Sequence, residues 1–119
     1  MITYEQFEKV MSFDTRGCCC IEIEFYVKGS EKFDGCWMGK MPDEKAKADL
    51  YWFGLTADGK NAYDYATFDE MACAKIFDGK SFSDIWDDIE FFSVDGLDPM
   101  ERFLSYLKNE GPFIGAAQW

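Results

Sequence analysis

A strict alternation of side-chain character over residues 18–28 constrains the fold more than any other feature of the sequence. The run reads CCCIEIEFYVK, and its first apolar set points to one side of an extended chain: Cys19, Ile21, Ile23, Phe25 and Val27. The intervening set, which includes Glu22 and Glu24, points to the other side. A period of two with one polar side predicts a strand whose sheet is packed on one face only.

Other segments have the character of strands, and they lie at residues 33–40, 49–55, 61–66 and 90–94. The segment 41–48 contains Pro42 and several charges, so we expect a polar connection there. Asp58-Gly59 is a strong signal for a hairpin turn. The runs before residue 67 are therefore expected to form an antiparallel meander.

Capping patterns and apolar spacing predict the helices. Thr3 with Gln6, and Thr67 with Glu70, match the capping box and predict helices over residues 4–12 and 67–75. A further helix is expected from Ser81, because four apolar residues after it share one face: Phe82, Ile85, Trp86 and Ile89. Asp98 followed by Pro99 predicts a last helix that ends near Asn109, with a buried stripe of Met100, Phe103, Leu104 and Leu107.

This order of elements predicts an α+β fold, with an antiparallel sheet of about four or five strands and helices packed on one face. No stretch resembles a linker, so residues 1–119 are expected to form a single domain. The apolar tail at residues 112–119 follows Gly111-Pro112, which should stop the last helix.

Composition excludes several function classes. The chain has no histidine, so catalysis of the Ser-His-Asp or Cys-His type cannot arise within it. The formal net charge of −11 argues against direct binding of nucleic acid and of anionic membranes. We therefore expect a protein that is not an enzyme and uses no metal or cofactor. The absence of a signal-like or membrane-spanning segment favours a cytoplasmic location.

The cysteines do not suggest a disulfide framework. Their number is odd, three are adjacent, and no pair has C-x-x-C spacing: Cys18, Cys19, Cys20, Cys36 and Cys73. Reduced thiols in a core are the expected state. A redox or soft-metal role for Cys18–Cys20 is the alternative.

The acidic charge is concentrated in the second half of the chain. Residues 61–119 hold 12 acids and 4 bases, which gives −8, whereas residues 1–60 hold 11 acids and 8 bases, which gives −3. Carboxylates spaced along a surface can steer a basic partner. The candidate acidic face consists of Asp84, Asp87, Asp88, Glu90 and Asp95. The alternative is a solvated surface that maintains solubility.

Aromatic residues are in surplus around the strands. On a sheet covered on one side, one of two sets must face away from the helices unless another element covers it: either Tyr51, Phe53 and Leu55, or Trp52 and Gly54. The candidate anchors for a partner are Trp37, Tyr51, Trp52, Tyr63 and Tyr65. The alternative is a second small core under residues 41–48 or under the tail.

We therefore expect an interaction module that presents acidic and aromatic side chains to a basic protein. In composition the chain resembles the small acidic inhibitor and adaptor proteins of phages and mobile elements, some of which mimic nucleic acid. The most specific form of this hypothesis is an inhibitor that competes with nucleic acid for the basic protein. One alternative is a small-ligand pocket lined by Trp37, Trp52 and Trp86. Another is a carboxylate-based enzyme that uses Glu22 and Glu24.

Overall fold

The computed structural model describes residues 2–15, 17 and 19–110. Within them the order of elements is α1 (Tyr4–Ser12), β1 (Ile21–Val27), β2 (Asp34–Asp43), β3 (Ala48–Gly54), β4 (Ala62–Tyr65), α2 (Phe68–Cys73), the 3-10 helix η1 (Trp86–Asp88), β5 (Ile89–Val94) and α3 (Pro99–Asn109). The predicted apolar tail and Cys18 lie outside the described residues.

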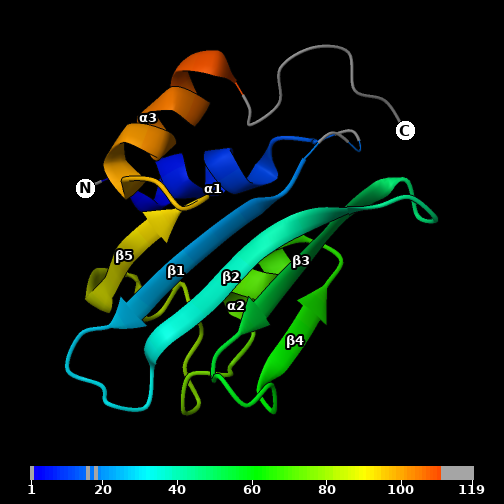
Figure 1. The fold of residues 1–119 in the computed structure, drawn as a ribbon. Helices are drawn as coiled ribbons and strands as arrows, with labels where there is room; N and C mark the ends of the chain where they lie inside the picture. The colour runs from blue at the N-terminus through cyan, green and yellow to red at the C-terminus, as the bar shows by residue number, and fades with distance from the viewer. Residues whose placement is uncertain (1, 16, 18, 111–119) are drawn as a thin grey trace.

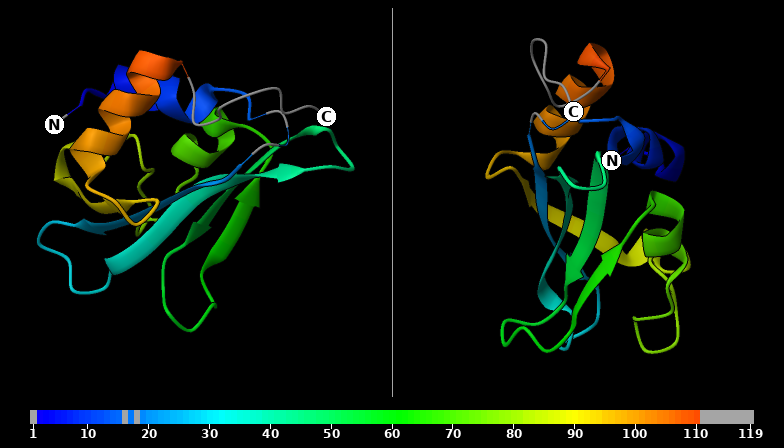
Figure 2. Two further views of the ribbon diagram at one scale, coloured as in Figure 1. Left: turned by 45° about the horizontal axis from the view of Figure 1, so that its top comes forward. Right: turned by 90° about the vertical axis from the view of Figure 1, so that its right-hand side faces the viewer.

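The strands form one antiparallel sheet in the order β4-β3-β2-β1-β5 (Figure 1). Helices α1, α2 and α3 lie on the same side of this sheet, as Figure 2 shows. The α+β architecture predicted from the sequence is therefore confirmed. The first four strands form a meander, and β5 returns to pair with β1.

The core lies between the sheet and the helices and is dominated by phenylalanine. The alternation of β1 is confirmed, because Ile21, Ile23 and Phe25 are fully buried. Phe7 of α1 stacks on Phe91 with ring centroids 5.2 Å apart. Its ring also lies 5.8 Å from Phe103 in an edge-on arrangement. Aromatic contacts of this kind join α1 and α3 to the inner face of the sheet.

The β2–β3 hairpin is longer than the sequence predicts. Met41 pairs with Leu50 and Pro42 with Asp49, so the predicted polar connection 41–48 is wrong at both of its ends. Pro42 is tolerated because β1 pairs with β2 only as far as Lys40. Beyond that point β2 is an edge, where a missing N–H breaks no ladder hydrogen bond.

The predicted helix from Ser81 is also wrong, because only the short η1 forms there. Ser81 and Asp84 hydrogen-bond to each other's backbone N–H through their side chains. This reciprocal arrangement is that of a capping box, and the N–H of Ile85 donates to the carbonyl oxygen of Ser81 at 3.2 Å, so a first turn does form. The helix goes no further than η1 because the chain enters β5 at Ile89, which pairs with Val27 of β1. Phe82 and Ile85 are nevertheless buried, so the apolar spacing identified core residues but not their conformation.

Helix α3 begins as predicted, with the Asp98 side chain accepting from the N–H of Glu101 and Pro99 in the first turn. Its buried stripe differs from the prediction. Phe103 and Tyr106 are buried, whereas Leu104 is 51% exposed and Met100 is 37% exposed. The helix is rotated because Tyr106 donates a hydrogen bond to Asp95.

Candidate functional surface

The sheet has a second face that none of the described helices covers (Figure 2). We call this surface the outer face. It is formed by the strand positions that alternate with the buried ones, and these include Glu22, Glu24, Tyr26, Asp34, Trp37, Gly39, Met41, Leu50, Trp52, Gly54, Ala62, Asp64, Glu90 and Ser93. Large apolar side chains on it reach solvent, with Trp37 39% exposed and Met41 44% exposed.

Cross-strand register orders the outer face into rows. In one row Gly54, Trp37 and Glu24 lie side by side on β3, β2 and β1. In the next row Asp64 of β4, Trp52 of β3 and Gly39 of β2 lie side by side. Each tryptophan is therefore directly opposite a glycine.

The two glycines differ in their surroundings. A Cβ at Gly39 would lie 2.0 Å from the carbonyl oxygen of Ile21 and 3.0 Å from the Trp52 ring, so the indole lies across Gly39. A Cβ at Gly54 would have no atom of the described residues within 4 Å, so the space above Gly54 is open.

The charge of the outer face is one-sided. Its carboxylates include Glu22, Glu24, Asp34, Asp64 and Glu90, and none of its strand positions is Lys or Arg. Glu90 has a cation nearby, with Lys28 Nζ 3.5 Å from its carboxylate. An apolar centre with a negative border is the arrangement that this face offers to a partner.

The predicted aromatic anchors are divided between the two faces. Trp37 and Trp52 lie on the outer face. Of the two orientations that the alternation of β3 allowed, the one in which Trp52 and Gly54 face away from the helices is therefore the one that forms. Tyr51 is not an exposed anchor, because it is 8% exposed and its hydroxyl donates to the carbonyl oxygen of Met11 at 2.8 Å. Burial, with the nearby negative charge of Asp49, raises the pKa of Tyr51 to about 12. Tyr63 and Tyr65 are opposite Phe53 and Tyr51 and share the inner side with them.

Four of the predicted acids are near one another in the chain and lie at exposed or half-exposed positions: Asp84, Asp87, Asp88 and Glu90. Asp84 pairs with Lys75 at 3.1 Å. The backbone N–H of Ser81 and the Lys75 ammonium lower the pKa of Asp84 to about 2. Asp87 and Glu90 line a shallow cavity of about 290 Å³ with Lys28.

Asp95 does not belong to that acidic face. Its backbone pairs with Glu22 beyond the end of β5, and one carboxylate oxygen accepts from the N–H of Glu22 at 2.9 Å. The other oxygen accepts from Arg102 Nε at 3.0 Å and from the Tyr106 hydroxyl. Asp95 therefore connects α3 to the sheet, and its carboxylate is occupied by this structural role.

A buried polar cluster that sequence reasoning missed lies on the inner side of β2 and β3. Lys40 is fully buried, and its Nζ donates to the carbonyl oxygens of Met11, at 2.8 Å, and of Phe13. Asp49 lies 3.2 Å from the same nitrogen and accepts from the backbone N–H and hydroxyl of buried Thr15. Burial lowers the pKa of Lys40, and Asp49 opposes that change. The cluster binds the chain after α1 to the sheet.

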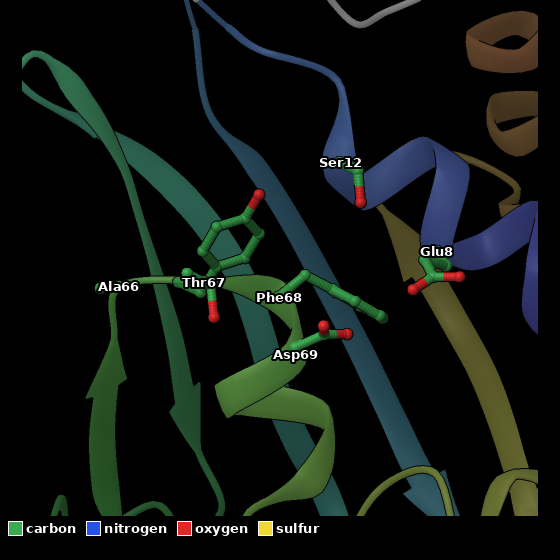
Figure 3. Close-up of a pocket in the computed structure, with 7 residues that line it drawn as sticks. Glu8, Ser12, Ala66, Thr67, Phe68 and Asp69 are labelled. Carbon is green, nitrogen blue, oxygen red and sulfur yellow. The ribbon is translucent and has the colours of Figure 1, made fainter.

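The largest cavity described opens between α1, α2 and β3 and has a volume of about 360 Å³. Its lining includes the carboxylates of Glu8 and Asp69, which extend from α1 and α2 toward the same space (Figure 3).

The expected pocket of three tryptophans does not form. Trp86 lies on the inner side against Phe7, with ring centroids 5.3 Å apart, whereas Trp37 and Trp52 are on the outer face.

Glu22 and Glu24, the carboxylates considered for an enzyme, lie on the open outer face and line none of the three cavities described for this chain.

Cys36 is buried, Cys19 is half-buried, and Cys20 and Cys73 are exposed, so a core position is confirmed for Cys36. Among the described residues, no group of three or more Cys, Asp or Glu side chains could hold a metal ion.

No helix within the described part of the chain is both long enough and apolar enough to cross a membrane. No family model matches the sequence, and neither a curated protein nor a solved structure matches it.

Proposed function

We propose that this chain is a non-enzymatic interaction module of the cytoplasm that binds a basic protein through the outer face of its sheet. The observation that carries the proposal is the joint presence of exposed Trp37 and Met41 with carboxylates and no outward Lys or Arg in the strands. Exposed aromatic side chains are typical anchors of protein interfaces. The surrounding carboxylates add charge selectivity and speed encounter with a cationic surface.

Charge also selects between a second copy of the chain and a different partner. Two outer faces brought together would place the carboxylates of Glu22, Glu24 and Asp64 against an identical acidic set. Like charges opposed across an interface are unfavourable. A basic protein removes this repulsion. A nucleic-acid-binding protein is the sharpest candidate, because its cationic surface is built for phosphates.

The test compares charge reversals that change net charge equally. The full-length chain with Glu22→Lys and Glu24→Lys is compared with Glu31→Lys and Glu44→Lys, which lie in exposed loops. Both variants and the wild type are used to capture proteins from a cell lysate, and the captured proteins are quantified. The proposal expects one basic protein to be retained by the wild type and the loop variant and lost from the outer-face variant.

Affinity for the purified partner should then fall as salt is raised from 50 to about 300 mM, since exposed charges are screened. Added duplex DNA should displace the partner if the inhibitor form is right. Equal capture by both charge-reversal variants would contradict the outer face as the binding surface. Salt-independent binding would contradict electrostatic recognition.

A further inference from the structure

The open space above Gly54 is a notch in the outer face, bordered by Trp37 on β2 and Ala62 on β4. Neighbouring strands are about 4.8 Å apart, so a residue without a side chain between two others leaves room for a flat group. Trp52, two residues earlier on β3, does not fill the notch, because its ring is turned over Gly39. Trp37 is therefore left with an exposed indole beside an empty position.

One carboxylate lies beside this notch. Asp64 is two residues along β4 from the partner of Gly54, which makes it a diagonal neighbour of Gly54 at about 7–8 Å. Glu24 is the cross-strand neighbour of Trp37 on β1, so it lies two strands from Gly54, on the far side of Trp37. Among the described residues, neither Glu24 nor Asp64 has a side-chain hydrogen bond or ion pair within the chain.

We propose that the notch receives an arginine side chain of the basic partner, with its guanidinium against the Trp37 indole and near the Asp64 carboxylate. A planar cation is attracted to the face of an indole, and a carboxylate beside it completes the recognition. The notch offers a flat floor at Gly54, an aromatic wall at Trp37 and a carboxylate at Asp64. This inference rests on the proposed function and names the group that the partner presents.

Arginine fits this site better than lysine for two physical reasons. The guanidinium is planar and stacks on an aromatic ring, whereas an ammonium presents a compact, strongly hydrated charge. The guanidinium also presents several donors in a fixed plane, which allows it to hydrogen-bond a carboxylate while its face stays on the ring. The site should therefore discriminate between two residues of equal charge.

The binding experiment uses the full-length chain and three short peptides that are identical except at two positions. Both positions hold arginine in the first peptide, lysine in the second and citrulline, the uncharged near-isostere of arginine, in the third. Binding is followed through the NMR signal of the Trp37 indole N–H, assigned with the Trp37→Leu variant. The arginine peptide should shift this signal and bind about three- to tenfold more tightly than the lysine peptide. The citrulline peptide should produce no saturable shift.

A substitution that fills the notch separates binding from folding. Gly54→Val adds a β-branched side chain in open space on a strand, so the melting temperature should stay the same or rise. The affinity of this variant for the arginine peptide should nevertheless be about tenfold or more lower than that of the wild type, because the added side chain occupies the space proposed for the guanidinium. Leu104→Ala, at an exposed apolar position of α3 away from the outer face, is the matched control and should leave the affinity within about twofold.

Equal binding of the citrulline peptide, equal binding of the lysine peptide, no binding of any peptide, or unchanged binding by Gly54→Val would each overturn the inference. These results are distinguishable from failure of the proposed function. If the captured partner is lost by Glu22→Lys with Glu24→Lys but kept by Gly54→Val, the outer face binds a basic protein without an arginine in the notch. If both variants keep the partner, the proposed function fails as well.

Discussion

The ammonium nitrogen of Lys40 lies 3.2 Å from a carboxylate oxygen of Asp49, and the two side chains are 0% and 6% exposed. Removing one member of a buried ion pair leaves an uncompensated charge away from water. Asp49→Ala would also leave the N–H and hydroxyl of Thr15 without their acceptor. We expect it to lower the free energy of unfolding by about 3–5 kcal/mol, measured by urea denaturation.

Asp64→Ala is the matched control, because Asp64 is an exposed aspartate on the neighbouring β4. Its effect should stay within about 0.5 kcal/mol. A similar small effect for Asp49→Ala would show that the buried pair does not hold the segment after α1 to the sheet.

Tyr51 should make stability depend on pH above neutrality. Its pKa is raised from 10.0 to about 12, so the unfolded chain loses this proton at lower pH than the folded chain does. The stabilisation is complete below pH 10.0 and is lost as the pH rises toward about 12, by roughly 2–3 kcal/mol in total. Urea midpoints of the wild type and of Tyr51→Phe, compared between pH 9 and about 11, measure this term. Parallel pH profiles for the two proteins would contradict it.

Gly39 and Gly54 should respond oppositely to alanine. A Cβ at Gly39 would overlap the carbonyl oxygen of Ile21, which is backbone and cannot rotate away. Gly39→Ala is expected to lower the free energy of unfolding by about 3 kcal/mol or more, because β1 and β2 must separate. Gly54→Ala should be neutral or should stabilise by up to about 1 kcal/mol. Thermal denaturation of the pair checks both signs, and equal destabilisation would contradict the different surroundings described for them.

Two adjacent residues of α3 test which face of the helix is buried. Phe103 is fully buried and Leu104 is 51% exposed. Phe103→Ala should lower the free energy of unfolding by about 3–5 kcal/mol, whereas Leu104→Ala should cost less than about 1 kcal/mol. Comparable losses measured by urea denaturation would restore the stripe predicted from sequence, in which both residues face the core.

Asp95 should matter for stability more than its partial exposure indicates. It accepts hydrogen bonds from Glu22, Arg102 and Tyr106, and its φ of 54° lies in the left-handed region. Asp95→Ala is expected to cost about 2–4 kcal/mol, since buried donors lose their acceptor and alanine disfavours this conformation. Asp95→Asn should cost less, because asparagine tolerates the conformation and keeps one acceptor. Thermal unfolding that ranks the two variants in the opposite order would contradict this role.

Much of the architecture was predictable because it follows from local patterns. Alternation located β1, capping residues located the starts of α1 and α3, and one polar side of β1 indicated a half-covered sheet. The failures came from contacts beyond the local pattern. The turn at Ser81 does not extend into a helix because Ile89 pairs with Val27 of β1, and the orientation of α3 is set by a tyrosine that reaches Asp95.

The candidate surface was predictable only in part. Sequence reasoning named Trp37 and Trp52 but could not choose the face, because both alternatives fit the alternation of β3. Tyr51 was misplaced because its hydroxyl finds an acceptor in α1, a contact between residues 40 positions apart. Lys40 was overlooked because a charged residue at the predicted end of a strand gives no sign of a buried partner, although Lys40 continues the inward register of Cys36 and Met38 and lies opposite Ile21 and Tyr51.

The pairing of β1 with β5 joins segments 73 positions apart, as the contact between Glu22 and Asp95 shows. During synthesis β1 therefore has β2 as a neighbour long before its other edge is occupied. A nascent chain that has emerged only as far as Tyr65 presents Phe25 and Phe53 beside an unpaired strand, a combination that promotes aggregation. Pairing of β5 with the open edge of β1, or a chaperone that shields this edge until β5 has been made, should therefore limit aggregation of this intermediate.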